Sequence, residues 1–105
     1  MDLSCIHKRA IRKGLEFDLD TEWYKKELGK GICTATKLSF KLKPTNVMLN
    51  PYYPAIDRID SSKGYTKDNC QLVLSIFNML KLNYDEVTVK RFCESFVQIY
   101  EENLI

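Results

Sequence analysis

Hydrophobic residues recur at helical spacing near the start of the chain, over residues 3–13. One side of this segment is apolar, and the other side is basic. Gly14 follows directly and can take the left-handed conformation that ends a helix. We therefore predict a helix over residues 3–13. Its apolar side carries Leu3, Ile6 and Ala10, and its basic side carries Lys8, Arg9, Arg12 and Lys13.

Two further elements are predicted before residue 30. Residues 15–19 alternate apolar and acidic side chains, which is the period of an extended segment with one buried face. A second helix is predicted over residues 21–28, with Asp20 or Thr21 as its cap and Gly29 at its end. Its core residues are Trp23, Tyr24 and Leu28.

Turn-forming residues dominate the stretch that follows. Residues 31–43 are predicted to form a tight turn and a short hairpin, because apolar side chains alternate there. The alternating residues are Ile32, Leu38, Phe40 and Leu42. Residues 45–54 hold several Asn and Pro residues and are predicted to be a loop that packs across the body.

The pattern between residues 54 and 83 predicts a strand, a loop, a second strand and a helix. The expected strands are residues 55–57 and 70–74, and Gly64 is expected to take a positive φ in the loop. The helix over residues 75–82 has an apolar face and a polar face. The apolar face carries Ile76, Phe77 and Leu80, and the polar face carries Ser75, Asn78 and Lys81.

A final helix is predicted over residues 86–101, with Asp85 as its cap. Its broad apolar face is expected to be core. That face consists of Val89, Phe92, Cys93, Phe96, Val97 and Tyr100. The chain thus reads as one α+β domain over residues 1–105: a lead-in of helices and hairpin (1–53), the strand–loop–strand–helix unit (54–83), and a C-terminal helix (85–102) packed on it.

Composition and charge narrow the class of protein. The 105 residues are 45% hydrophobic and 29% charged, which suits one modest globular core. No apolar run approaches the about 20 residues that span a membrane, and no secretory signal pattern opens the chain, so a cytoplasmic protein is expected. The first 56 residues carry ten basic against six acidic side chains. This excess fits a polyanionic partner, although a solvated basic face is the plainer interpretation.

The cysteines and the single histidine carry little signal of their own. Cys5, Cys33, Cys70 and Cys93 are widely spaced without a C-x-x-C pair, so reduced thiols fit better than a disulfide framework, and a zinc site has no support from the spacing. His7 lies in the basic helix, where a surface or interface role is commoner than catalysis.

The residues around Gly64 indicate chemistry, because carboxylates, amides and cations gather there. Asp and Asn oxygens are hard ligands that suit Mg²⁺, and a lysine can meet a phosphate as a point charge. The segment D-R-I-D-x-x-x-G-Y-x-x-x-N-x-Q-x-V-x-x-x-x-N-x-x-K, residues 57–81, resembles the HNH, or His-Me finger, endonucleases with a ββα-metal core. It is most similar to variants common in bacteriophage genomes, in which Asp-Arg-x-Asp replaces Asp-His.

The resemblance implies roles for individual residues. Asp57 and Asn78 would bind a divalent metal, Mg²⁺ or Mn²⁺, and Asn69 would take the middle position that ties the loop to the second strand. DNA would be bound by residues of the unit and of the first helix. Those residues are Arg58, Lys63, Lys81, Lys8, Arg9, Arg12 and Lys13.

Two departures from the family pattern matter. Arg58 stands where the general-base histidine is expected, and a guanidinium cannot accept a proton from water. Asp60 is the nearest substitute, and His7 or a metal-bound hydroxide are the alternatives. Many members also hold a structural zinc with two C-x-x-C pairs. Here the corresponding positions are Cys33 with Thr36 and Leu74 with Phe77, so we expect a hydrophobic cluster and no structural zinc.

Two functions follow from the resemblance. The first is a metal-dependent endonuclease acting on DNA as a monomer or homodimer, with Arg58, Asp60 and Asn69 in catalytic positions. The second is a catalytically silent HNH-fold protein that binds nucleic acid or a protein partner, such as a phage inhibitor or accessory factor. Either would act in the cytoplasm of a bacterial or phage-infected cell.

Overall fold

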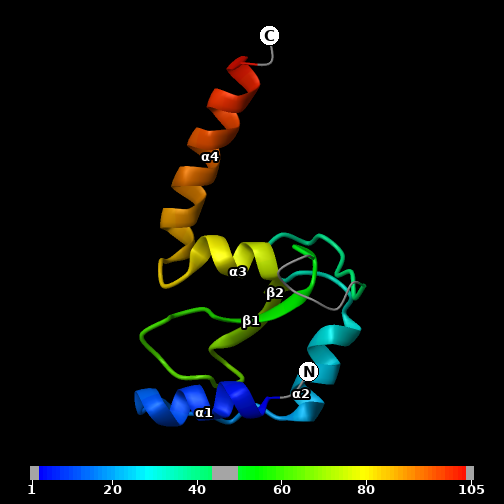
Figure 1. Ribbon diagram of the computed structural model, residues 1–105, viewed down its shortest axis with the longest axis vertical. Coiled ribbons are helices and arrows are strands. Elements are labelled where there is room, and N and C mark those ends of the chain that lie inside the picture. Colours follow the sequence, from blue (N-terminus) through cyan, green and yellow to red (C-terminus); the bar gives the residue numbers. More distant parts are fainter. Residues whose placement is uncertain (1–2, 44–49, 104–105) are drawn as a thin grey trace.

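The computed structural model describes residues 3–43 and 50–103 and is of mixed α and β type. Within these ranges the chain forms helices α1 (Ser4–Lys13) and α2 (Thr21–Gly29), strands β1 (Pro54–Arg58) and β2 (Cys70–Leu74), and helices α3 (Ser75–Lys81) and α4 (Glu86–Asn103). Figure 1 shows the two strands in the middle, with α3 on one side and α1 and α2 on the other. The order β1, β2, α3 is compatible with a small ββα unit.

The two strands pair antiparallel, and their register sets the geometry of the site. Pro54 lies opposite Leu74 and Arg58 opposite Cys70, which places Asp57 opposite Gln71. Leu72, Val73 and Leu74 are all buried, so β2 is covered on both faces and does not alternate. β2 leads into α3 without a loop, which fixes the side chains of α3 relative to β1.

The N-terminal helices form as their patterns predict. Gly14 takes φ +67° and ends α1, and the carboxylate of Asp20 accepts a hydrogen bond from the backbone N–H of Trp23 at 2.8 Å to cap α2. The main core lies between these helices and the sheet. It consists of the buried residues Ala10, Leu19, Trp23, Tyr24, Ile56, Tyr65, Cys70 and Leu72.

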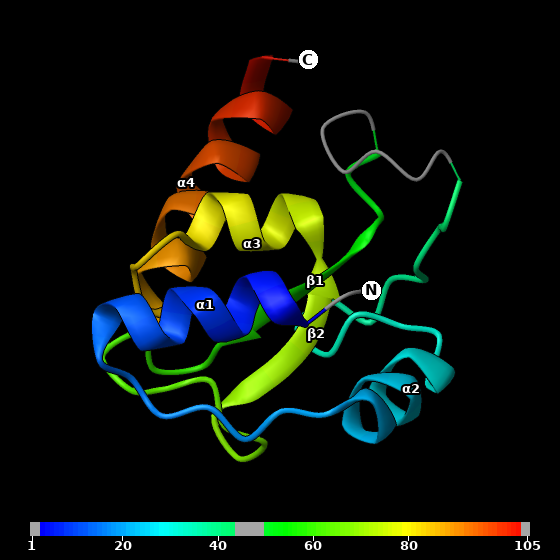
Figure 2. The ribbon, with the colours of Figure 1, turned by 60° about the horizontal axis from the view of Figure 1, so that its bottom comes forward.

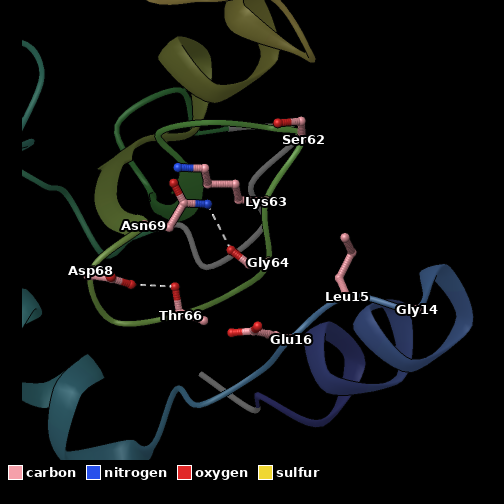
Figure 3. A pocket seen from close by; sticks show the side chains of 9 residues that line it. All are labelled: Gly14, Leu15, Glu16, Ser62, Lys63, Gly64, Thr66, Asp68 and Asn69. Atoms are coloured by element: carbon pink, nitrogen blue, oxygen red, sulfur yellow. Dashed lines mark hydrogen bonds between the residues drawn. The ribbon is translucent and has the colours of Figure 1, made fainter.

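The loop between β1 and β2 rests on the extended segment after α1. The backbone N–H of Tyr65 donates to the carbonyl of Glu16 at 2.8 Å, and that of Asp18 donates to the carbonyl of Tyr65 at 3.1 Å. A Cβ at Gly64 would lie 2.5 Å from the carbonyl oxygen of Glu16. Figure 3 shows the loop at Gly64 running beside the segment that holds Glu16. The predicted positive φ at Gly64 is wrong: the glycine is required by close backbone contact.

The stretch between α2 and β1 is less regular than the sequence predicts. Over residues 31–43 a single bridge joins Ile32 and Ser39, and no strand forms. Of the four alternating apolar residues only Phe40 is half-buried. Part of the loop predicted over residues 45–54 lies outside the described residues. Its described part contacts the start of α3, where the hydroxyl of Ser75 donates to the carbonyl of Asn50 at 2.9 Å.

The faces of α3 and α4 differ from the prediction. In α3 the polar face points inward, with Ser75 and Lys81 buried, whereas Ile76 and Leu80 are exposed. In α4, capped as expected by the Asp85 carboxylate, no residue is buried, and Cys93 is exposed. Only the beginning of α4 lies near α3, and Figure 2 shows the rest extending away from the body. The expectation that α4 packs as core is therefore wrong.

Candidate functional site

A cavity of about 200 Å³ opens between α1, the end of β1 and the end of α3. We call it the cationic cleft, because three of its side chains are arginine or lysine. It is lined by Arg9, Lys13, Ile56, Asp57, Arg58, Ser61, Tyr65, Asn78, Leu82 and Asn83. Five of the residues singled out in the sequence thus meet here. They are Arg9, Lys13, Asp57, Arg58 and Asn78.

The carboxylate of Asp57 is buried and forms an ion pair at the base of the cleft. The Nζ of Lys81 lies 3.1 Å from its Oδ1 and 2.9 Å from its Oδ2. Gln71, opposite on β2, donates from Nε2 to Oδ2 at 2.9 Å. A buried charged pair is tolerated only when each partner is also hydrogen-bonded, and these contacts supply the hydrogen bonds that Asp57 needs.

Lys81 is enclosed on all sides. Its side chain is 0% exposed, and its ammonium also donates to the carbonyls of Arg58 at 2.8 Å and Ile59 at 3.3 Å. Two carboxylate oxygens and two carbonyl oxygens therefore surround the charge. This burial opposes the expected contact of Lys81 with the DNA backbone, and that contact stays a prediction.

Arg58 holds the loop that follows β1. One terminal nitrogen of its guanidinium donates to the carbonyls of Ser61 at 2.8 Å and Lys63 at 3.0 Å. The guanidinium lies 4.7 Å from the centre of the Tyr65 ring, which is within the range of a cation–π interaction. Arg58 thus places a positive charge at the cleft, and its hydrogen bonds to the loop hold the guanidinium in position.

Asn69 closes the same loop from the side of β2. Its Nδ2 donates to the carbonyls of Asp60 at 3.0 Å and Gly64 at 2.8 Å, and its Oδ1 accepts from the backbone N–H of Asp60 at 3.0 Å. Figure 3 shows the amide turned into the loop. The side chain is occupied by the loop backbone and does not line the cleft, so the geometry gives it a loop-holding position and no contact with a ligand there.

Asp60 is poorly suited to act as a base. Its Oδ1 accepts from the hydroxyl of Ser62 at 2.6 Å and from the backbone N–H of Ser62 at 2.9 Å. These hydrogen bonds hold the pKa of the carboxyl below its ordinary value, and the nearby charges of Lys63 and Arg58 act in the same direction. A weaker base than an ordinary aspartate takes protons from water even less readily.

The remaining predicted contacts lie outside the cleft. Lys63 lines a second cavity, of about 420 Å³, between the loop and the segment after α1 (Figure 3). Lys8 and Arg12 are exposed on α1 but do not line the cleft. His7 stacks on Phe17, with ring centres 4.4 Å apart, and so covers the extended segment.

Most of the positions that the resemblance assigns to zinc ligands form a small hydrophobic cluster. Cys33, Val73 and Leu74 are buried together, and Phe40 and Phe77 pack against them. The Sγ of Cys33 still accepts from the backbone N–H of Thr36 at 3.4 Å. Burial would raise the pKa of this thiol, but hydrogen bonds from Thr36, Leu74 and Ala35 outweigh it and lower the pKa. The expected packing of Leu74 and Phe77 is confirmed, and the absence of zinc stays a prediction.

The residues at Asp57 do not fit a divalent metal as they stand. Both oxygens of Asp57 already accept from Lys81, and Asn78 offers only a neutral amide. No group of three or more His, Cys, Asp or Glu side chains able to hold an ion occurs among residues 3–43 and 50–103. The carboxylate of Asp57, which the resemblance assigns to Mg²⁺ or Mn²⁺, is instead paired with the ammonium of Lys81.

Sequence reasoning missed three residues of the site. The ring of Tyr65 packs against the Arg58 guanidinium, Gln71 donates a hydrogen bond to Asp57, and Asn83 lines the cleft. Gln71 could have been found from the strand register, since an antiparallel pair that begins at Pro54 and Leu74 places it opposite Asp57. Asn83 lies beyond the motif, and no sequence signal marks it.

Comparison of the chain with protein-family models, curated proteins and solved structures found no significant match. Within the described parts of the chain, none of the helices has the length and apolar character needed to cross a bilayer. The function is therefore argued from the site.

Proposed function

We propose that this chain binds the phosphodiester backbone of DNA in the cationic cleft, as an HNH-type protein that does not depend on a metal for binding. The observation that carries the proposal is the meeting of Arg9 and Lys13 from α1 with Arg58 from β1 around one cavity. Charge of one sign gathered in a concave site raises the local potential and attracts a phosphate.

The side chains of the cleft suit a nucleic-acid strand. Arg9 and Lys13 are one helical turn apart and exposed, so both can reach a phosphate beside α1. Tyr65 and Ile56 give the cleft an apolar wall, and Asn78 and Asn83 add amide groups able to donate hydrogen bonds. The choice of DNA over RNA rests on the family resemblance.

The Asp57–Lys81 pair supports binding by removing an unfavourable charge. A carboxylate lining the cleft would repel phosphate, but the ammonium at 2.9 Å cancels its charge at close range. The three cations that line the cleft then act without an opposing charge at its base. An anionic ligand can therefore bind in the cleft beside the Asp57–Lys81 pair.

A titration of the ¹⁵N-labelled protein with a short DNA duplex in EDTA tests this proposal. Amide signals of Arg9, Lys13, Asn78 and Asn83 are expected to shift, because these residues line the cleft. Amide signals from the C-terminal end of α4 are expected to keep their chemical shifts. Shifts confined to other surfaces, or binding seen only after Mg²⁺ is added, would contradict the proposal.

Hydrolysis of the bound strand is the second candidate function. It is favoured by the presence of Asp57 and Asn78, the residues the resemblance assigns to a metal, in one cleft. It is opposed by the engagement of Asp57 with Lys81 and by the lack of a free base at Arg58 or Asp60.

Plasmid nicking separates the two candidates. Supercoiled DNA is incubated with wild type and with Asn78→Ala and Asn83→Ala, in Mg²⁺, Mn²⁺ or EDTA. A binding protein leaves the plasmid supercoiled in every case. Metal-dependent nicking that is lost in Asn78→Ala and kept in Asn83→Ala would establish the nuclease instead.

A further inference from the structure

The apolar face of α4 is left uncovered by the described parts of the chain. No residue of the helix is buried, and its aromatic side chains are among the most exposed apolar groups, with Phe92 at 71% and Phe96 at 69%. Figures 1 and 2 agree that α4 extends away from the body beyond α3. An apolar surface of this kind marks an interaction site more often than a solvated face.

The dimensions of the molecule support this. The radius of gyration is 15.1 Å and the longest extent is 49 Å. A compact chain of this length has a radius of gyration of about 13 Å. An isolated helix in water is only marginally stable, so an extended α4 needs a packing partner for most of its length.

The uncovered face continues onto α3. Ile76 and Leu80 are exposed, and together with Val89 and Cys93 they line an apolar groove between the two helices of about 470 Å³. A helix lying along α4 would cover both this groove and the aromatic side chains. The partner therefore has to present an apolar helical face of similar length.

The charges of α4 identify that partner. Lys90 and Arg91 lie in its first half, and Glu101 and Glu102 lie in its last turn. Eleven residues make about three full turns. Lys90 and Glu101 therefore lie on one flank of the apolar face, and Lys90 also forms an exposed ion pair with Glu94 in the same helix at 2.9 Å. Glu102 lies on the other flank, whereas Arg91, one turn after Val87, is turned toward the opposite face.

We propose that a second copy of the chain covers this face, with the two α4 helices antiparallel and Phe96 at the centre. In that arrangement the same flanks of the two helices adjoin, so the Lys90 of each copy lies near the partner's Glu101. A parallel pair would instead bring Glu101 beside the partner's Glu102 and leave Lys90 without an acidic partner across the interface. Charge complementarity selects the antiparallel pair.

Sedimentation equilibrium tests the association with two matched variants. The wild type is expected at twice its chain mass of 12.3 kDa. Phe96→Glu should restore the monomer mass, whereas Val87→Glu should leave the dimer, because Val87 is equally exposed but lies two and a half turns away, on the opposite face. A monomeric wild type, or equal effects of the two substitutions, would overturn the proposal.

Disulfide trapping tests the orientation. In a Cys5→Ser background, Tyr100→Cys places a second accessible thiol two helical turns after Cys93, too far for a bond within one helix. An antiparallel pair should give cross-linked peptides that join position 93 to position 100. Bonds of 93 to 93 and of 100 to 100 would show a parallel pair and contradict the assignment.

Discussion

The ion pair between Asp57 and Lys81 links β1 to α3 at the base of the cationic cleft. Both side chains are buried, and every contact of the ammonium is with an oxygen of β1 or of the residue after it. A buried ion pair adds little to the free energy of unfolding compared with apolar residues of the same shape. Removing one partner, however, leaves an uncompensated buried charge, which is strongly destabilising.

Lys81→Met should therefore destabilise the protein by about 3–5 kcal/mol. Lys67→Met is the matched control, because the Lys67–Asp20 ion pair has a similar length of 2.8 Å but is about half exposed. It should cost far less than Lys81→Met, because an exposed ion pair contributes little to stability. Urea unfolding measures both, and Asp57→Leu combined with Lys81→Met should recover much of the loss. Equal losses for the two lysines would contradict the described burial.

Gly64→Ala should destabilise the protein by about 1–3 kcal/mol, since its new methyl group would meet the Glu16 backbone. Gly29→Ala is the control, because a Cβ there has no neighbour within 4 Å and the residue ends α2. That substitution should be neutral or stabilising. Thermal unfolding compares them, and a neutral Gly64→Ala would show that the loop does not rest on the segment after α1.

Elements defined by local signals were predictable from the sequence. The Asp20 cap, the Gly14 stop, and the strand–loop–strand–helix order all form within a residue or two of their predicted bounds. The face that each helix buries was not predictable in the same way. Lys81 points inward because of Asp57, 24 residues away, and a helical period carries no information about such a partner.

The same reasoning explains the errors at Gly64 and α4. The contact that requires Gly64 comes from Glu16, far away in the sequence, so the local turn chemistry suggested a positive φ instead. For α4 the periodicity correctly gave an amphipathic helix, but periodicity does not say whether the apolar face meets this chain or another. In the site, the residue types were predictable, whereas the capture of Asp57 by Lys81 was not.

The cluster around Cys33 joins the turn after α2 to β2 and α3. Leu74→Ala should cost about 2–5 kcal/mol, because Leu74 is buried in this cluster. Leu38→Ala, at a residue of the same turn that is half exposed, is the control and should cost far less. Denaturant unfolding with and without added zinc checks the assignment. Stabilisation of the wild type by zinc would mean that Cys33 still binds a metal.

At the scale of the whole molecule, the two proposed functions belong to two separate regions. The cationic cleft lies between α1 and the ββα unit, while the uncovered apolar face lies on α4 and the outer side of α3. An antiparallel dimer through α4 would carry two clefts. Of the ten basic side chains among the first 56 residues, Arg9 and Lys13 line the cleft.

The salt dependence of DNA binding tests the central claim most directly. Affinity for a short duplex is measured in EDTA over a range of salt concentrations for wild type, for Arg9→Gln with Lys13→Gln, and for Lys8→Gln with Arg12→Gln. Both doubles remove one arginine and one lysine from exposed positions of α1. Loss of two phosphate contacts should lower the slope of log K against log salt by about 2 for the Arg9/Lys13 double. The Lys8/Arg12 double should keep a slope near that of wild type, and equal slopes for the two doubles would contradict a binding site in the cleft.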